Sequence, residues 1–196
     1  RAVRDTDALI HVVRNFASYG TDPPDPENDF LLLDQELIAL DANVVQKRLD
    51  RMAAESKKGK SADPDEHGLL ARCRDALAQE TPLRRLPELA ESRLLRGYGL
   101  MSAKPVLVLF NNADEDESLP PLSEAAAPET CMVIRGKLEH ELAQMTEEEA
   151  AELLSEFNIA ASAADRVIRA SYEILGLISF FTVGDDEVRA WTVRRG

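Results

Sequence analysis

The 196-residue sequence contains little of what marks several large protein classes. Cys73 and Cys131 are its only cysteines, too few for a disulfide framework, which favours a reducing, cytoplasmic environment. It has no apolar run near the ~20 residues of a membrane span and no signal-peptide pattern, so no membrane partner is expected. Basic residues are outnumbered, with 23 Lys and Arg against 36 Asp and Glu and a formal net charge of -13. That balance disfavours free-standing binding to DNA or RNA.

Aromatic residues make up only 5% of the chain, whereas charged residues make up 30% and apolar residues 44%. This balance is typical of a helix-rich domain with enough apolar side chains for a core. Apolar runs at 8–13, 106–110 and 130–134 predict strands, the first two of them buried. Helices are predicted over 146–157, after a capping box, and from 162 onward. Strands that alternate with helices indicate an α/β fold with a mostly parallel sheet.

A helical segment separates the first two predicted strands. A long helix is predicted over 29–57, because apolar residues recur at steps of four and three at Leu33, Leu37, Leu40 and Val44. Asp63 is the expected N-cap of a second helix, and a short helix over 88–96 is expected to end at Gly97. We therefore expect residues 29–100 to form a helical hairpin inserted into the α/β domain.

The two ends of the sequence suggest a piece of a longer protein. The chain begins with Arg1, and its last residues predict two strands, 178–183 and 187–193, around a turn at 184–186. A single hairpin is at best marginally stable in water, so further strands are expected beyond it. Trp191, in the second of these strands, is expected to pack into a core; the alternative is that this face of the sheet contacts a partner.

Two loops at the predicted carboxyl ends of strands carry the candidate chemistry: Asn111-Asn112-Ala113-Asp114 and Arg135-Gly136-Lys137. In a parallel sheet both would face one crevice, where ligands bind. The Asp114 carboxylate offers acceptor oxygens to paired N–H donors of a purine base, and the Asn side chain either bonds the ring or ties the loops together. Gly136 would let the backbone approach the base. The competing interpretation is ordinary turn chemistry after any strand.

Several segments resemble one family. These are His11-Val12-Val13-Arg14-Asn15-Phe16, Lys104-Pro105-Val106-Leu107, Lys137 to Leu142 and, most specifically, the blocks 170–184 and 187–194. They are similar to the YchF family, the Obg-like ATPases, which are P-loop nucleotide hydrolases of the translation-factor class. The similarity spans essentially the whole chain.

The resemblance implies a domain plan. In that family a G domain with a mostly parallel sheet is interrupted by a helical coiled-coil insertion and followed by a C-terminal TGS domain. Residues 1–28 and 101–177 would then be parts of the G domain, 29–100 the insertion, and 178–196 the first hairpin of the TGS domain. This assignment agrees with the helical hairpin expected from the sequence pattern.

The resemblance also implies a ligand and a partner. It implies ATP or GTP as the bound nucleotide, Mg²⁺ as the metal of the intact protein, and the ribosome as partner. The base-binding residues would be Asn111, Asn112, Asp114, Gly136 and Lys137. The family's phosphate-binding loop and metal ligands would precede Arg1, and no G-x-x-x-x-G-K-[ST] occurs in the chain. The chain alone is therefore expected to be inactive, whereas its parent would be an ATPase or GTPase.

Two departures from the family pattern matter. The family's base-reading motif is Asn-x-x-Glu, but here it ends in Asp114. An ionised Asp can only accept hydrogen bonds, which by itself favours guanine over adenine, so ATP and GTP both stay open. Arg135-Gly136 stands where the family tends to have a small Ser/Cys-Ala pair. The sequence does not explain the arginine, which is either a surface residue or a group that approaches the nucleotide.

A different class of function remains as an alternative. The chain would then be a non-enzymatic interaction module in which the hairpin of 29–100 docks a partner. Because the net charge is -13, ribosome contact would have to be made by local basic groups: Lys57, Lys58 and Lys60, or Arg194 and Arg195.

Other residues are interpreted as structural. His11 and both cysteines are interpreted as core residues, and the acidic run 114–117 as a solvated loop.

Overall fold

The computed structural model describes residues 2–59, 61, 63–156, 161–184 and 186–195. The chain forms two compact units, which are considered separately. The first contains Arg1–Asp7 and Asn28–Pro105, and the second contains Ala8–Glu27 and Val106–Gly196. The α/β fold class is confirmed, with a parallel three-stranded sheet, a helical hairpin and a small antiparallel sheet.

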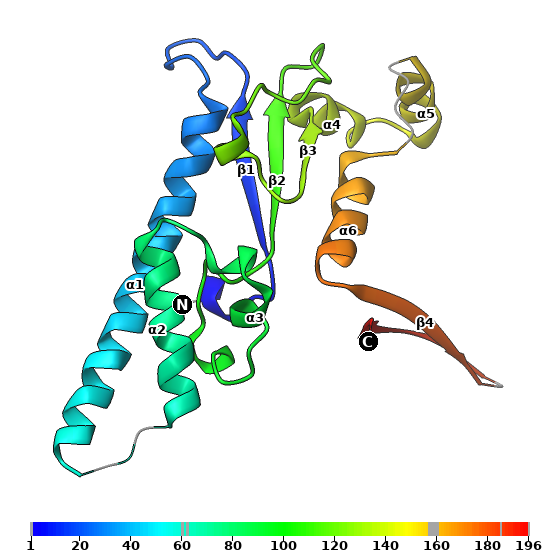
Figure 1. Ribbon diagram of the computed structural model, residues 1–196. Helices are drawn as coiled ribbons and strands as arrows, with labels where there is room; N and C mark the ends of the chain where they lie inside the picture. Colours follow the sequence, from blue (N-terminus) through cyan, green and yellow to red (C-terminus); the bar gives the residue numbers. More distant parts are fainter. Residues whose placement is uncertain (1, 60, 62, 157–160, 185, 196) are drawn as a thin grey trace. The chain divides into compact units, whose positions relative to one another are not determined.

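The first unit is helical. Its elements are η1 (Ala2–Asp5), α1 (Pro26–Lys57, which begins at the end of the other unit), α2 (Pro64–Ala78), η2 (Leu83–Arg85), α3 (Pro87–Ala90) and η3 (Arg96–Tyr98). Figure 1 shows α1 and α2 side by side as a hairpin. They share a core of buried apolar side chains that includes Val45, Leu49, Leu70, Cys73 and Leu77. The shared core accounts for the stability of helices with a weak amphipathic pattern.

The predicted apolar stripe of α1 was partly wrong. Leu37 is buried, but Leu40 is 48% exposed, and the buried face instead includes the aspartates Asp34 and Asp41. Both carboxylates have partners in the same unit. Asp34 pairs with Arg84, and Asp41 accepts the backbone N–H groups of residues 101 and 102. Burial of a charged group is tolerated when it is paired and hydrogen-bonded in this way.

The start of α2 was predicted correctly and the following segment was not. The Asp63 side chain accepts a hydrogen bond from the Asp65 N–H at 3.0 Å, as an N-cap should. The helix expected over 88–96 is instead the single turn α3 and the 3₁₀ turn η3, and the left-handed residue is Gly99, at φ 59°. Leu89 and Leu95 are both buried in one core. In a continuous helix they would point about 120° apart, so the break lets both reach it.

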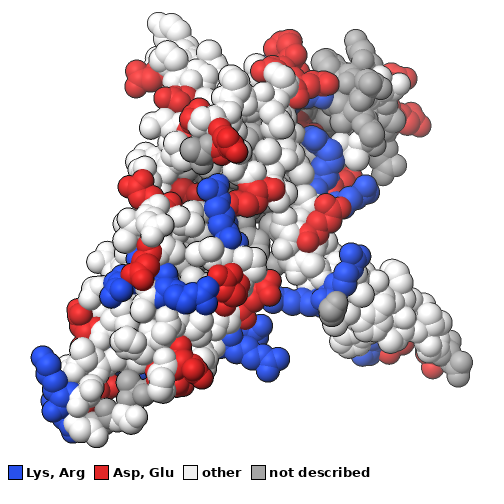
Figure 2. Space-filling model, in the orientation of Figure 1, with Lys and Arg blue, Asp and Glu red and all other residues white. Residues whose placement is uncertain are grey.

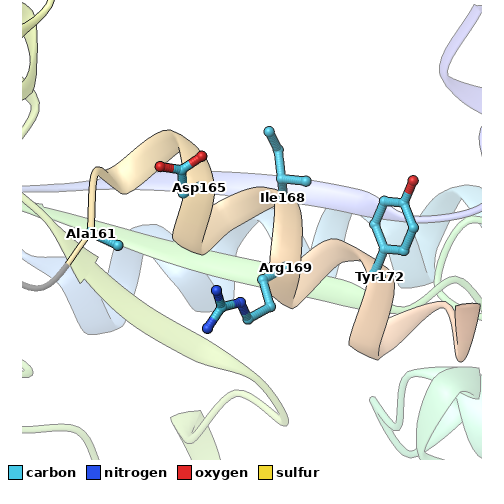
Figure 3. A pocket seen from close by; sticks show the side chains of 5 residues that line it. All are labelled: Ala161, Asp165, Ile168, Arg169 and Tyr172. Carbon is cyan, nitrogen blue, oxygen red and sulfur yellow. The ribbon is translucent and has the colours of Figure 1, made fainter. Parts of the chain in front are cut away.

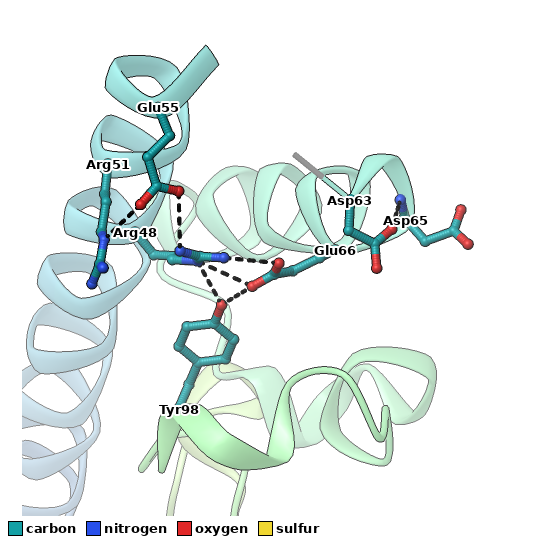
Figure 4. Close-up of polar contacts among 7 residues, drawn as sticks. All are labelled: Arg48, Arg51, Glu55, Asp63, Asp65, Glu66 and Tyr98. Atoms are coloured by element: carbon teal, nitrogen blue, oxygen red, sulfur yellow. Dashed lines mark hydrogen bonds and ion pairs between the residues drawn. The ribbon is translucent and has the colours of Figure 1, made fainter. Parts of the chain in front are cut away.

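A polar cluster joins three elements of this unit (Figure 4). The Arg48 guanidinium on α1 binds both carboxylate oxygens of Glu66 on α2, at 3.1 and 3.0 Å, and also donates to the Tyr98 hydroxyl at 3.0 Å. Tyr98 in turn donates to Glu66. The hydrogen bonds from Arg48 and then from Tyr98 hold the pKa of the Glu66 carboxyl below its ordinary value. The cluster fixes the angle between the hairpin and η3.

The second unit contains both sheets. The parallel sheet has the order β1 (Leu9–Asn15), β2 (Val106–Asn112) and β3 (Cys131–Ile134). The other elements are η4 (Glu124–Ala126), α4 (Gly136–Leu142), α5 (Glu147–Glu156), α6 (Ala163–Ile174), β4 (Leu177–Val183) and β5 (Val188–Arg194). Leu107 and Leu109 of β2 pack against Ala170 of α6, so α6 covers one face of the sheet.

Burial differs between the neighbouring strands. β2 is buried on both faces, as predicted, with only Asn111 half-exposed. β1 was also predicted to be buried, and this was wrong: Val13 is buried, whereas Ile10 and Val12 are 52% and 56% exposed. The difference follows from position, because β1 lies at the edge of the described sheet and β2 lies at its centre. His11 is half-buried.

The helix starts in this unit follow local signals. Thr146 and Glu149 form the predicted capping box, with the Thr146 N–H donating to Glu149 at 3.0 Å. The predicted end of α5 at residue 157 lies outside the described residues, and α5 is described to Glu156. Ser162 caps α6 by accepting the Asp165 N–H at 3.1 Å. These starts depend on side chains three residues apart, which a sequence shows directly.

The final hairpin is present, but its aromatic residue is not in a core. β4 and β5 pair antiparallel, with Phe180 opposite Trp191, and Asp185 of the predicted turn lies outside the described residues. Trp191 is 47% exposed, so its expected core packing was wrong. Its indole N–H donates to the Thr182 hydroxyl at 3.0 Å. Two strands offer a side chain cross-strand neighbours but no second layer to cover it.

Candidate functional site

The two predicted loops meet at one edge of the parallel sheet. β2 and β3 are parallel neighbours whose register runs from Val108 opposite Cys131 to Asn111 opposite Ile134. The carboxyl ends of both strands therefore lie at the same edge (Figure 1). Strand β2 extends through Asn112, two residues further than predicted, so both asparagines belong to the strand end. This is the edge where open α/β sheets bind ligands.

Asn111 connects the two loops directly. Its Oδ1 accepts the Gly136 N–H at 2.8 Å. A Cβ atom on Gly136 would lie 2.9 Å from that oxygen, closer than side-chain carbons normally approach. Glycine thus leaves space for the Asn111 amide, which would have to shift if residue 136 carried a Cβ. The arrangement matches the predicted role of an asparagine that ties neighbouring loops together.

Asp114 points its carboxylate at the turn after β3. Oδ1 accepts the Leu138 N–H at 3.2 Å and Oδ2 accepts the Lys137 ammonium at 3.1 Å. The Asp114 side chain is 19% exposed and that of Lys137 is 76% exposed. The hydrogen bond and charge of Asp114, followed by the charge of Glu141, raise the pKa of Lys137. An ionised carboxylate has about four acceptor positions, so Asp114 retains capacity for further N–H donors.

Asn112 uses its side chain within the protein. The residue is buried; its Oδ1 accepts from the Asn15 side chain at 2.9 Å, and its Nδ2 donates to the carbonyls of Asp116 at 3.1 Å and Ser118 at 2.7 Å. These bonds hold the end of β1 and the loop 113–118 to the end of β2. Asn112 therefore helps to position the loop 113–118 and the end of β1 at this edge of the sheet.

Arg135 is the residue at this edge whose role the sequence left unexplained. Its side chain is only 9% exposed, and its NH1 donates to the Asp114 carbonyl at 3.2 Å and pairs with the Glu117 carboxylate at 2.9 Å. The acidic run 114–117 was expected to be a simple solvated loop, and these contacts show that it is not. Asp114 and Glu117 are both engaged, and Asp116 accepts from the N–H and hydroxyl of Ser118.

Sequence reasoning missed two contributors to this edge, Asn15 and Leu138, and left a third, Arg135, without an assigned role. Asn15 lies at the carboxyl end of β1, which belongs to the same parallel sheet. The rule that selected the other two loops would therefore have found it. Leu138 contributes only its backbone N–H, which no residue type reveals. Arg135 was part of a selected loop, but its role could not be assigned because its partners lie 18 to 21 positions away in the chain.

Other features of the described residues do not add chemistry to this edge. Among those residues, no group of three or more His, Cys, Asp or Glu side chains is arranged to hold a metal ion. A separate open depression of about 440 Å³ lies along α6 (Figure 3). It is lined by Ala161, Asp165, Ile168, Arg169 and Tyr172, and contains none of the predicted site residues.

Figure 2 shows acidic and basic side chains interspersed over the face in view. None of the helices in the described ranges combines the length and apolar composition needed to cross a membrane.

Comparison with known proteins finds relatives that match nearly the whole chain. No protein-family model matches it. It is 34% identical to the "Ribosome-binding ATPase YchF" of Bacillus subtilis and 31% identical to that of Escherichia coli O157:H7, each over 99% of this chain. The "Structure of the Schizosaccharomyces pombe YchF GTPase" matches all of this chain with a TM-score of 0.81 and 28% identity. The chain spans 56–57% of the length of these relatives. Over its own length, the chain is similar to these YchF proteins in sequence and in fold.

Proposed function

We propose that this chain supplies the base-recognition part of a purine-nucleotide site, in a protein that hydrolyses ATP or GTP and associates with ribosomes. The observation that carries the proposal is the convergence of Asp114 on the turn of Lys137 and Leu138 at the carboxyl edge of the sheet. The relatives' names, ribosome-binding ATPase and GTPase, support the class of ligand and partner.

The residues at this edge suit a purine through distinct roles. Asn111 holds Gly136 in place, so the turn after β3 presents its backbone at a constant distance from β2. Asp114, held by the Leu138 N–H, supplies the acceptor oxygens for N–H groups of the base. Lys137 balances the charge of Asp114 and, being largely exposed, can move when a base approaches.

The nucleotide preference rests on opposing indications. Guanine presents two N–H donors on the edge that a carboxylate reads, whereas adenine presents one donor and one acceptor. Asp114 can only accept when ionised, which favours guanine. The relatives of 31–34% identity are named ATPases, which favours adenine. A binding experiment must therefore compare both purines.

We assign no hydrolytic step to the residues of this chain. Bound Mg²⁺ neutralises phosphate oxygens during phosphoryl transfer, next to a glycine-rich loop and its lysine. The described residues contain neither a metal-holding acidic cluster nor the G-x-x-x-x-G-K-[ST] pattern. The role proposed for this chain is to bind and orient the base.

The domain plan proposed is an interrupted G domain. We propose that 29–100 is the helical insertion, that 1–28 and 101–177 belong to the G domain, and that 178–196 begins a TGS domain. The division of the chain into a helical unit and an α/β unit supports the first assignment. The separate antiparallel pairing of β4 with β5 supports the last.

The nucleotide proposal is tested by titrating labelled ATP, GTP and CTP against the natural protein that carries this chain. Asp114→Ala is expected to weaken purine binding about tenfold or more, because a charge-assisted hydrogen bond to the base is lost. Asp75→Asn is the matched control, since Asp75 is an exposed carboxylate on α2 paired only with its neighbour Arg74 in the contacts described. Equal affinity of the wild type for purines and CTP, or an unchanged affinity in Asp114→Ala, would contradict the proposal.

Ribosome association is tested at the end of the helical hairpin. α1 ends in Lys57, followed by Lys58, whereas Lys60 lies outside the described residues. Local cations are needed because the chain as a whole carries a charge of -13 and rRNA is anionic. The double change Lys57→Glu with Lys58→Glu is expected to reduce co-sedimentation with ribosomes, and Lys47→Glu, on the exposed side of the same helix, is the control. Equal co-sedimentation of the two variants would exclude this tip.

A further inference from the structure

We propose that Arg135 is the positioning residue of the base-recognition edge: it holds the loop 113–118 in the one conformation in which Asp114 faces the turn after β3. This inference rests on the proposed nucleotide function, and deepens it by assigning the control of base specificity to a residue outside the Asn-x-x-Asp motif. The contacts described for Arg135 are to the loop, so the proposed action runs through Asp114.

The contacts of Arg135 span the whole loop. NH1 donates to the Asp114 carbonyl at 3.2 Å and pairs with Glu117 at 2.9 Å. The first contact fixes the backbone of the residue whose side chain is to read the base, and the second fixes the loop three residues further on. A planar guanidinium with five donors can serve two acceptors at once, which a lysine ammonium does less well.

The two members of the ion pair differ in burial. The Arg135 side chain is 9% exposed, whereas Glu117 is 66% exposed. The surrounding protein therefore holds the arginine in place, and the acidic loop contacts it through Glu117. A buried cation retains its place only when it is paired and hydrogen-bonded, so the loop and the arginine depend on each other.

The remaining anchors of the loop act at other points. Asn112 holds the carbonyls of Asp116 and Ser118 from the strand end, and the Leu138 N–H holds the Asp114 side chain. In the contacts described, the side chain that donates a hydrogen bond to the Asp114 backbone carbonyl is that of Arg135. Without Arg135 the loop would stay attached at its far end while the Asp114 backbone could turn. The expected defect is thus confined to the base-reading residue.

The test measures binding of GTP, ATP, CTP and inorganic tripolyphosphate by the natural protein that carries this chain, with amide hydrogen exchange of residues 113–118. Arg135→Ala is expected to weaken binding of the preferred purine nucleotide about tenfold and to speed exchange in the loop. Affinity for tripolyphosphate should stay unchanged, because it has no base. Purine affinity of Arg135→Lys should lie between those of the wild type and Arg135→Ala, since one contact is retained. The control is Arg189→Ala, which removes another arginine paired to a carboxylate, on the exposed hairpin.

Glu117→Gln provides an independent arm, because this exposed side chain is replaced without disturbing a core. It is expected to speed exchange of the loop and to weaken purine binding about threefold, as exposed ion pairs are worth less than buried ones. Purine affinity and loop exchange unchanged in both Arg135→Ala and Glu117→Gln would overturn the inference. So would an equal loss of tripolyphosphate and purine binding in Arg135→Ala, which would indicate a general structural role. If the wild type itself does not prefer purines over CTP, the proposed function fails instead, which keeps the two failures distinguishable.

Discussion

The backbone N–H of Gly136 donates to Oδ1 of Asn111 across 2.8 Å, and there is no room between them for a methyl group. This one bond joins the ends of two parallel strands that are 25 positions apart in the chain. A glycine on one side and a short amide on the other fit this bond without a shift of either group. Together with the pairing of β2 and β3, the bond helps to hold the turn after β3 next to the end of β2.

Gly136→Ala should disrupt this junction. Its Cβ would lie 2.9 Å from Oδ1 and 3.2 Å from Nδ2 of Asn111, so the amide must rotate away and lose its bond, at a cost of about 1–3 kcal/mol. Thermal or urea unfolding measures the change. Gly68→Ala is the control: Gly68 lies within α2 with nothing within 4 Å of an added Cβ, and alanine there should stabilise the helix by about 0.5–1 kcal/mol. A Gly136→Ala protein as stable as the wild type would show that the junction has slack.

Glu66→Gln should destabilise the helical unit in a pH-dependent way. The folded-state pKa of Glu66 is lowered, first by its hydrogen bond from Arg48. Its stabilising effect is therefore complete above the unfolded pKa of about 4.3 and is lost as the pH falls through the lower folded value. The variant should be about 1 kcal/mol less stable at pH 7, allowing for partial exposure, and the difference should shrink in acid. Urea unfolding from pH 3 to pH 7 measures this; Glu91→Gln, at an exposed position, should show no such trend.

Asp41→Asn should destabilise the same unit with the opposite dependence on pH. Asp41 is buried and accepts from the Met101 N–H at 2.8 Å and from the Ser102 N–H and hydroxyl, both at 2.7 Å. Asparagine turns an NH₂ group towards these donors, at a cost of about 1–3 kcal/mol at pH 7.

Burial is the main reason that the pKa of Asp41 is raised. Its protonation therefore contributes stability that is complete below the unfolded pKa and declines as the pH rises through the folded value. The gap between wild type and Asp41→Asn should be widest in acid and narrow towards neutral pH. A gap that widens with rising pH would refute this assignment. Asp50→Asn, exposed on α1, is the control.

The two cysteines should differ in reactivity. Burial raises the pKa of the Cys73 thiol to about 11, and Cys73 is fully buried in the helical core. Cys131 on β3 is half-buried, and its pKa is also raised by burial. Alkylation at pH 8 followed by peptide mass spectrometry should label Cys131 slowly and Cys73 only after unfolding, because the thiolate is the reactive form. Native labelling of Cys73 as fast as that of Cys131 would contradict the buried position.

Features encoded by neighbouring residues were predictable from the sequence. Asp63 was identified as the cap of α2, and the Thr146 box as the start of α5, because a cap and its N–H partner are two or three residues apart. The buried strand β2 was also predicted, since five successive apolar residues fit a strand covered on both faces. The common edge of the two loops followed from parallel pairing alone.

Features that depend on distant partners were not predictable. The buried face of α1 includes Asp41, whose partners Met101 and Ser102 are 60 and 61 positions away. The spacing of apolar residues therefore predicts that Leu40 is buried, whereas the fold buries its neighbour Asp41.

For this protein, the residue order by itself determined the N-caps of α2, α5 and α6, because a cap and its partner are close together in the chain. The alternation of strands with helices indicated the parallel sheet, at whose carboxyl edge the two loops meet. Only the tertiary structure decided which carboxylates are buried and which residues hold them. Arg135 is the clearest case: its neighbours in sequence give it no role, and its place against Asp114 and Glu117 gives it one. The physical reason is that burying a charge becomes favourable only when a partner from another segment is already in reach.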